Sequence, residues 1–559
     1  MKRTLGFRTA LSAIAGFVLV LAALESTMIS AAEPDGATRE LTIEKRYLLL
    51  PVKRGAPRRR MTVLLEGKVY REFEIELSAA NPDFWAFLDL ADIRGKKATL
   101  QLQPAADSEL NAVRQDDQPA DPATAYNEKL RPQFHFSPLR GWNNDPIGLV
   151  YYRGEYHLFF QHNPYGWDWG NIHWGHAVSS DLVHWKQLPI ALYPHAFGDW
   201  CFSGSAVVDK ENTAGFKSGA DDVIVAAYTS TGRGECIAFS NDRGRTFTDY
   251  AENPVVRHNG RDPKLIWYAP GQTWVMAVYD ESDGKRFIAF HTSVDLKHWT
   301  YQSRIEGFFE CPELFELPVT GKPNQLKWVI YAGDGDYSIG RFDGKRFEVE
   351  SGKHRFNRGN SFYASQTFND IPTNDGRRIQ IAWGRVAMPG MPFNQMMLFP
   401  NELKLRDTDE GVRMFAEPVK EIERLYTSSL TRRDEPLAPA QPTIVDIRGE
   451  LLDIRADLEI GSAQELGLVV RGIAVRYDVG KKELTAVKSA AALSPQEGRI
   501  RLRILVDHSS LEVYANDGLV YMPIGVVPAA DSKSVEVYAR GGAARIKLLQ
   551  VHELNSAWN

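Results

Sequence analysis

The run "YHLFFQHN" (residues 156–163) is the first of five apolar runs that recur along the middle of the chain. The other four are "DVIVAAYTS" from Asp222, "TWVMAVYDE" from Thr273, "KWVIYAGDG" from Lys327 and "RIQIAWGR" from Arg378. Each run ends in polar or glycine-rich sequence, as a central strand does. A repeat of roughly 50 to 70 residues built from strands and turns is typical of propeller blades. The five runs therefore predict five blades.

A second signature lies between these runs, where an acidic turn precedes an aromatic residue. It reads "SSDLVHWKQ" from Ser179, "SNDRGRTFTD" from Ser240, "SVDLKHWTY" from Ser293 and "FDGKRFEV" from Phe342. An array of β-sandwiches is the structural alternative, but its strands would be spaced more closely and less regularly.

Both flanks of the repeat region are also rich in strand patterns. "MTVLLEGKVYREFEIELS" from Met61 alternates around a turn, and "GRIRLRILVDHSSLEVYANDGLVYMPIGVV" from Gly498 contains a hairpin turn. We therefore predict an all-β chain with a five-bladed β-propeller, a C-terminal β-sandwich and an extra small N-terminal β-domain. The expected boundaries are an N-terminal domain at 33–105, an acidic Pro/Ala-rich linker at 106–125, the propeller at 126–425 and the sandwich at 430–559.

The first 32 residues have the pattern of a secretory signal peptide. Lys2, Arg3 and Arg8 precede an apolar run over residues 9–24, and small residues follow up to Ala32. An uncleaved anchor is the alternative, although the run is shorter than the roughly 20 residues of a membrane span. We expect a secreted or periplasmic protein with no membrane segment after cleavage at about residue 32.

Composition narrows the class of partner. The 559 residues carry a net charge of −5, which gives no reason to expect a nucleic-acid partner. Three cysteines, Cys201, Cys236 and Cys311, leave at least one free thiol, and their pairing is open. No zinc motif occurs, so we expect neither a metal nor a cofactor. The 13 Trp, 21 Tyr and 27 Phe residues suit either a sugar-binding surface or ordinary core packing.

Three carboxylates are candidates for chemistry. Asp145 lies in "WNNDPIG", Asp262 in "GRDPKLIW" and Glu310 in "FFECPELF", each beside a proline near a blade start. A turn role for Asp145 and a surface pair for Asp262 are the plain alternatives. Glu310 is flanked by phenylalanines, and an apolar setting raises a carboxyl pKa as a general acid requires. One charged and one protonated carboxyl are what cleavage of a glycosidic bond needs.

The segment over residues 131–194, which contains "RPQFHFSPLRGWNNDPIGLVYY", resembles glycoside hydrolase family 32. The resemblance continues through "CFSGSAVV" from Cys201, "RDPKLIW", "ECPELFEL", "FYASQTF" from Phe362 and "DHSSLEVYANDG", in the order of the family. It implies a five-bladed propeller followed by a β-sandwich. The family contains invertases, levanases, inulinases and fructan β-fructosidases.

The resemblance also implies residue roles. Asp145 would be the nucleophile, Glu310 the general acid/base, and Asp262 the residue that holds fructose hydroxyls and stabilises the transition state. Positions matching the fructose pocket of the family are Asn144, Gln161, Trp169, Phe202, Ser203 and Arg261. The reaction would be retaining hydrolysis through a fructosyl-enzyme, with carboxyls about 5 to 5.5 Å apart.

Two features depart from the family pattern. Asn143 and Ile147 stand where the family has Met and Asn, so the polar contact of that asparagine is in doubt. The N-terminal β-domain lies outside the core pattern and is similar to domains that precede some bacterial levanases. Packing, oligomer contact and weak glycan binding are open roles for it.

We therefore expect an exported β-fructosidase that releases terminal fructose from levan- or inulin-type fructans. The alternatives are an invertase acting mainly on sucrose, a fructosyltransferase, and a catalytically silent fructan-binding propeller. The preference for β-2,6 or β-2,1 linkages, exo or endo action and the oligomeric state are left open by the sequence.

Overall fold

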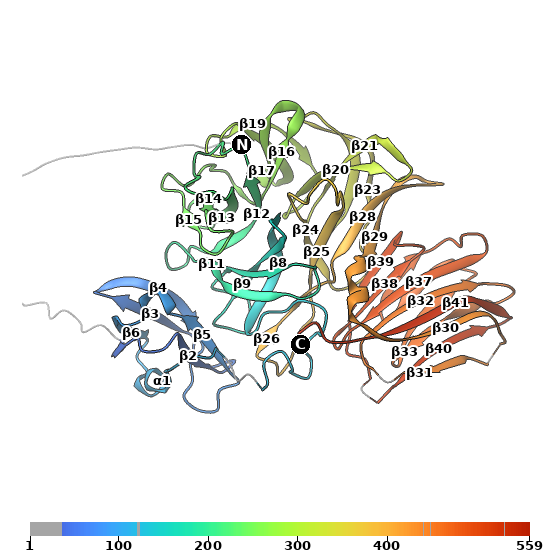
Figure 1. The fold of residues 1–559 in the computed structure, drawn as a ribbon, viewed down its shortest axis with the longest axis horizontal. Helices are drawn as coiled ribbons and strands as arrows, with labels where there is room; N and C mark the ends of the chain where they lie inside the picture. The colour runs from blue at the N-terminus through green and yellow to red at the C-terminus, as the bar shows by residue number, and fades with distance from the viewer. Residues whose placement is uncertain (1–35, 120–122, 440, 448, 530, 559) are drawn as a thin grey trace, which may run out of the picture.

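The computed structural model describes residues 36–119, 123–439, 441–447, 449–529 and 531–558. The predicted signal peptide at 1–32 lies outside these residues. Figure 1 shows a small blue β-domain, a central ring of sheets and an orange-red sandwich at the C-terminal end. No helix within the described ranges has both the length and the apolar character needed to cross a bilayer.

The central ring is a β-propeller whose blades are antiparallel sheets. Blades one to three are β8 (Gly141–Tyr152), β9 (Glu155–Asn163), β10 (His173–Ser179) and β11 (Lys186–Leu192); β12 (Cys201–Asp209), β13 (Val223–Ser230), β14 (Gly234–Ser240) and β15 (Thr248–Asp249); and β16 (Gly260–Tyr268), β17 (Thr273–Ser282), β18 (Lys285–Ser293) and β19 (Thr300–Glu306). Helix η2 (Ala269–Gly271) joins β16 to β17.

The last two blades share one sheet, joined by a single parallel bridge between Val319 and Leu405. They are β20 (Glu313–Val319), β21 (Lys322–Tyr331), β22 (Tyr337–Phe342) and β23 (Phe347–His354), followed by β24 (Phe362–Thr367), β25 (Arg378–Gly384), β27 (Met396–Met397), β28 (Asn401–Thr408) and β29 (Gly411–Pro418). Strand β26 (Phe393–Asn394) pairs in parallel with β8 and so closes the ring onto the first blade.

The five apolar runs form the second strand of each blade: β9, β13, β17, β21 and β25. These strands have a neighbour on both sides, and β13 is buried along its whole length. A strand packed on both faces needs apolar residues at every position, which is why the runs do not alternate. The innermost strands β8, β12, β16, β20 and β24 precede them.

The acidic turns join the third strand of a blade to the fourth. In blade three, Asp295 Oδ1 accepts hydrogen bonds from the backbone N–H groups of Lys297 (3.0 Å) and His298 (2.9 Å). Asp181, Asp242 and Asp343 make the equivalent bonds in their blades. The signature therefore marks a turn in which an aspartate side chain takes up free backbone donors.

The C-terminal domain is a sandwich of two six-stranded sheets with its own apolar core. Helix η3 (Lys420–Leu425) connects it to the propeller. One sheet contains β30 (Tyr426–Leu437), β32 (Leu452–Glu459), β37 (Arg499–Val506), β38 (Ser510–Ala515), β39 (Val520–Gly525) and β41 (Ala544–Leu554). The other contains β31 (Thr443–Asp446), β33 (Glu465–Val470), β34 (Ile473–Asp478), β35 (Glu483–Ala486), β36 (Ser489–Ala492) and β40 (Ser534–Arg540).

The N-terminal domain packs a four-stranded and a three-stranded sheet around one core. Its elements are β1 (Ala37–Thr42), β2 (Tyr47–Val52), β3 (Arg59–Leu65), β4 (Lys68–Ile75), β5 (Phe84–Asp89), η1 (Ala91–Ile93), β6 (Lys97–Gln103), α1 (Asp107–Ala112) and β7 (Arg114–Asp116).

The prediction of a linker at 106–125 is wrong for its first half, because α1 and β7 belong to the N-terminal domain. Strand β7 pairs with β2, and α1 buries Leu110 while Val113 follows it into the core. Leu110 and Val113 attach this segment to the core of the domain. The segment as a whole is polar, so its average composition resembles that of a linker.

A buried charge cluster joins the sandwich to the propeller. His135 is 1% exposed and contacts Asp507 Oδ2 through Nδ1 (2.7 Å) and Glu512 Oε1 through Nε2 (2.6 Å). Burial alone would lower the pKa of His135, but its hydrogen bonds and charge interactions with both carboxylates outweigh burial and raise the pKa to about 9. The "DHSSLEVY" motif of the sandwich is therefore a domain joint.

We expect His135→Gln to destabilise the protein by ~3 kcal/mol near pH 6.5, because it leaves two buried carboxylates without their cation. The pKa of His135 is higher in the folded protein than in the unfolded chain. Its contribution is therefore complete below about pH 6.5 and is lost as the pH rises through about 9. Urea unfolding of both proteins across this range should show the difference in unfolding free energy shrinking. A difference that is constant with pH would contradict a charged His135.

Candidate active site

The innermost strands carry a repeated irregularity at one end. In β8, Asn144 and Asp145 lie opposite the single residue Gln161 of β9, between the pairs Asn143↔His162 and Pro146↔Phe160. The same one-residue β-bulge recurs at residues 202–203 of β12, 262–263 of β16 and 364–365 of β24. A bulge redirects side chains that a regular strand would place on its faces. Here it turns polar residues toward the central channel.

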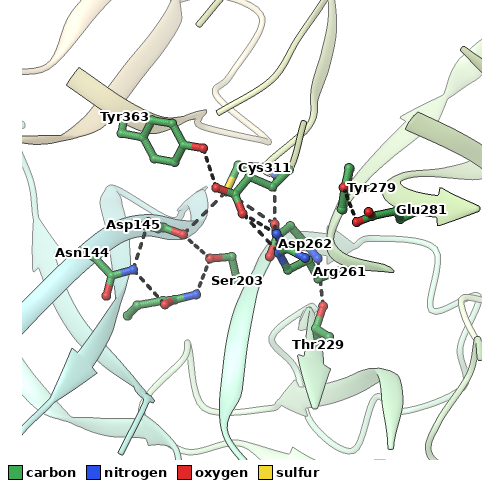
Figure 2. A network of polar contacts seen from close by, with 12 residues as sticks. Asn144, Asp145, Ser203, Thr229, Arg261, Asp262, Tyr279, Glu281, Cys311 and Tyr363 are labelled. Atoms are coloured by element: carbon green, nitrogen blue, oxygen red, sulfur yellow. Dashed lines mark hydrogen bonds and ion pairs between the residues drawn. The ribbon is translucent and has the colours of Figure 1, made fainter. Parts of the chain in front are cut away.

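Asp145 is 8% exposed and bonded to neutral donors. Asn144 Nδ2 donates to Asp145 Oδ1 (3.0 Å), and Ser203 Oγ donates to Asp145 Oδ2 (2.6 Å). Gln161 connects the two donors, since its Oε1 accepts from Asn144 (2.8 Å) and its Nε2 donates to Ser203 (2.5 Å) (Figure 2). Burial raises the pKa of Asp145, while the Ser203 and Asn144 hydrogen bonds oppose that rise.

Asp262 lies across the site from Asp145 in the left-handed region, at φ 67°. Its Oδ2 accepts the backbone N–H of Cys311 (3.0 Å), and its own N–H donates to Thr229 Oγ1 (2.8 Å). Burial raises the pKa of Asp262 to about 8, with Glu310 and Asp145 adding to the rise and Arg261 opposing it.

Glu310 is held by two groups near the opening of the site. Arg261 Nη2 donates to Glu310 Oε2 (2.7 Å), and Tyr363 OH donates to Glu310 Oε1 (2.5 Å) (Figure 2). The expectation of an apolar setting for this carboxyl is wrong. Phe308 is buried in the core between blades, and Phe309 lies beneath the Arg261 guanidinium (5.5 Å to its ring centre). The glutamate side chain itself is 20% exposed, and its carboxylate contacts the polar groups of Arg261 and Tyr363.

Cys311 and Tyr363 belong to the site but were not predicted as site residues. The Cys311 thiol lies 3.6 Å from both Asp145 Oδ2 and Asp262 Oδ2, and its pKa is raised by burial and by these neighbouring carboxylates. Tyr363 reaches Glu310 from the bulge of β24. The position of both within family-like motifs was the available signal. Cys201 and Cys236 are also free thiols, buried in one core cluster.

The nine predicted residues fall into two groups. Seven are linked through hydrogen bonds, ion pairs or the Cys311 thiol: Asn144, Asp145, Gln161, Ser203, Arg261, Asp262 and Glu310. Trp169 and Phe202 instead form an aromatic rim with Trp200. The ring centre of Trp169 lies 4.8 Å from that of Trp200 and 6.1 Å from that of Phe202. Trp169 is 43% exposed, so part of its side chain is accessible to a ligand.

The side chain of Ile147, which stands where the family has an asparagine, is buried in the core. It is 1% exposed and packs in the core between the first two blades with Phe159 and Trp174. Among the described residues, no group of three or more His, Cys, Asp or Glu side chains is arranged to hold a metal ion.

The arrangement suits chemistry at a neutral ligand that develops positive charge. Three carboxylates surround a space beside one guanidinium, and their field favours a cationic transition state. The two outer carboxyls differ in setting: Asp145 is enclosed by neutral donors, whereas Glu310 is accessible to solvent and ion-paired.

Comparison with known proteins identifies two family domains. Residues 135–418 match the glycosyl hydrolases family 32 N-terminal domain, and residues 421–553 match the family 32 C-terminal domain. The N-terminal β-domain precedes both matches.

Similar proteins include two bacterial levanases and fungal exo-inulinases. The levanase of Bacillus subtilis (strain 168) is 41% identical over 78% of this chain and 72% of its own length. The levanase of Bacillus sp. (strain L7) is 35% identical over 78% of this chain, which spans only 53% of that protein. The extracellular exo-inulinase inuE of Aspergillus niger is 30% identical over 78% of this chain and 96% of its own length.

Solved structures share the architecture. The exo-inulinase from Aspergillus awamori is 28% identical, with a TM-score of 0.70 over 78% of this chain and 100% of that chain. The Schwanniomyces occidentalis fructofuranosidase complexed with fructose is 27% identical, with a TM-score of 0.68 over 78% of this chain and 99% of that chain.

We expect Asp262→Asn to stabilise the fold at alkaline pH. The carboxyl binds its proton more tightly in the folded protein, so it lowers the unfolding free energy as the pH rises from about 4 to about 8. The amide keeps an acceptor for the Cys311 N–H and carries no charge. The gain should be ~1–2 kcal/mol near pH 8.5 and smaller near pH 5, measured by urea unfolding.

Glu313→Gln is the matched control, because this equally buried carboxylate is paired with Lys264 Nζ (2.7 Å). It should destabilise the protein, since the substitution leaves Lys264 buried without its partner. If Asp262→Asn destabilised the protein at both pH values, the idea that the charged form of Asp262 is unfavourable in the folded protein would be wrong.

Proposed function

Because the chain belongs to glycosyl hydrolase family 32, we propose that its three clustered carboxylates hydrolyse terminal β-fructofuranosyl bonds of fructans. The observation that carries this proposal is the gathering of Asp145, Asp262 and Glu310 close enough for their charges to interact, with Cys311 in contact with Asp145 and Asp262. The family resemblance of each motif assigns the roles that follow.

In the first step, a carboxylate oxygen of Asp145 attacks the anomeric carbon of the terminal fructosyl unit. The glycosidic C–O bond breaks as Glu310 gives its proton to the leaving oxygen. The products of this step are a fructosyl ester of Asp145 and the shortened chain. Hydrogen bonds from Asn144 and Ser203 keep Asp145 charged and aimed.

In the second step, the Glu310 carboxylate takes a proton from a water molecule. The resulting hydroxide attacks the anomeric carbon, the ester bond to Asp145 breaks, and fructose leaves with retained configuration. Tyr363 and Arg261 both donate to Glu310 and so orient this carboxyl, which the family roles make the acid of the first step and the base of the second. Asp262 would accept hydrogen bonds from fructose hydroxyls and stabilise the oxocarbenium-like transition state.

Fructans are favoured over sucrose as the main substrate. The relatives with the broadest matches to this chain are named levanases and exo-inulinases. An invertase acting mainly on sucrose is the second candidate, because two invertases also match this chain. Invertases 1 and 2 of Saccharomyces cerevisiae are each 35% identical over 52% and 57% of this chain.

We further propose that the protein is exported. The basic and apolar pattern over residues 1–32 supports a signal peptide. Polymeric fructans lie outside the cell, and the related inuE protein is named as extracellular.

The direct test is product analysis of the purified protein on levan, inulin and sucrose. We expect fructose as the only early product from a fructan, and a loss of at least ~1,000-fold in kcat for Asp145→Asn. Oligosaccharide products would instead show endo action. No release from any of the three substrates, with levan still bound, would overturn the hydrolase proposal in favour of a silent fructan-binding propeller.

Ser203→Ala tests how Asp145 is kept charged. Its hydroxyl lowers the pKa of Asp145, so its removal should move the acidic limb of the kcat/KM profile to higher pH by up to ~1 unit. Ser205→Ala is the matched control on the same strand, because its hydroxyl bonds the backbone of Pro263 and Leu265 instead. If the acidic limb of the kcat/KM profile is unchanged in Ser203→Ala, then that limb does not report the titration of Asp145.

A further inference from the structure

The loop between β9 and β10 carries Trp169, yet its neighbouring residues are anchored in the N-terminal domain. Tyr165 is 0% exposed and Trp167 is 7% exposed, and both belong to the apolar core of that domain. The Tyr165 ring stacks on Phe73 of β4, with 3.6 Å between ring centres. The propeller therefore contributes two aromatic side chains to a core that is otherwise built from residues before 114.

The far end of the same loop is held by two reciprocal hydrogen bonds. The Glu74 N–H donates to Asn171 Oδ1 (2.9 Å), and Asn171 Nδ2 donates to the Glu74 carbonyl (2.8 Å). This is how neighbouring strands pair, with an asparagine side chain in place of a second backbone. Asn171 Nδ2 also donates to Asn163 Oδ1 (3.2 Å), which ties the contact to the end of β9.

An arginine of the N-terminal domain covers the middle of the loop. The Arg54 guanidinium lies 3.7 Å from the ring centre of Trp167, and its Nε lies 3.8 Å from Asp168 Oδ2. Residues on both sides of Trp169 therefore contact the N-terminal domain, while Trp169 itself is 43% exposed.

The second loop of the aromatic rim, which leads into β12 and ends at Trp200, is held by the same domain. Arg71 lies 3.7 Å from the ring centre of Tyr193, and Arg60 lies 4.2 Å from that of Phe197. Trp169 and Trp200 meet edge to face. Strands β3 and β4 thus contact both loops that supply the rim.

We propose that the N-terminal domain contributes to the substrate site by positioning the Trp169–Trp200 rim for a fructosyl unit. This inference rests on the proposed function, because it takes Trp169 as a wall of the fructose pocket. Ordering a loop costs conformational entropy, and a rim ordered before binding spares the substrate that cost. Asp145 and Asp262 lie on the innermost strands β8 and β16, and Glu310 lies just before β20. All three lie outside the anchored loops, so loss of the anchor should raise KM and spare kcat.

The test is a double-mutant cycle in the full-length protein. Asn171→Ala, and separately Phe73→Leu, should raise KM for levan by about 3- to 10-fold with kcat changed less than about twofold. Trp169→Ala should raise KM by at least as much. In the Trp169→Ala background, Asn171→Ala and Phe73→Leu should have no further effect on KM, because the rim they position is already gone.

Arg114→Ala is the control within the same domain, because the contact described for its side chain is with the Trp85 ring in the three-stranded sheet. It should leave KM unchanged at a similar thermal midpoint. If Asn171→Ala fails to fold, Phe73→Leu carries the cycle from the other side of the contact.

The outcomes distinguish the positioning role of the N-terminal domain from the role of Trp169 in the fructose pocket. An unchanged KM in Asn171→Ala and Phe73→Leu, while Trp169→Ala raises it, would overturn the positioning role alone. An equal rise in KM in both backgrounds would also overturn it, since the anchor would then act through another route. An unchanged KM in Trp169→Ala would remove Trp169 from the fructose pocket and with it the premise of this inference.

Discussion

Mutual repulsion among three carboxylates is the constraint that the site has to meet. Asp145, Asp262 and Glu310 face one space, and burial raises the pKa of the first two. The surroundings oppose this with fixed dipoles and one cation: Asn144 and Ser203 on Asp145, the Cys311 N–H on Asp262, and Arg261 on Glu310. Such groups keep their orientation only if the backbone behind them cannot relax, and tightly packed blades provide that backbone.

Much of the fold was predictable because its strongest signals are local. The five apolar runs identify the second strands, which have a neighbour on both sides, and the aspartate turns mark the outer edge of the first four blades. The family resemblance located all three carboxylates. The bulges were not predictable, since an extra residue in β8 is defined only against its partner β9. Tyr363 and Glu310 meet only when the ring closes, so neither the tyrosine contact nor the polar setting of Glu310 could be read from neighbouring residues.

The two accessory domains are attached to the propeller by opposite means. The sandwich is joined through charge, with His135 held between Asp507 and Glu512 in a fully buried cluster. The N-terminal domain is joined through aromatic packing, with Tyr165 and Trp167 inserted into its core. The first joint depends on the proton that His135 carries, whereas most of the second is aromatic packing. The first lies beside the opening strand of the ring, whereas the second lies beside the aromatic rim.

The repeated bulge also separates the chemistry of this molecule from its architecture. Each bulge is one residue added to a strand; the remaining pairs with the second strand are regular in β12, β16 and β24, and β8 has a further bulge at residues 148–149. Deleting that residue would restore an ordinary ladder and leave the blade intact, but the polar side chains would return to the sheet faces. The regular pairs therefore define the blade, whereas the added residues decide which side chains leave it for the site.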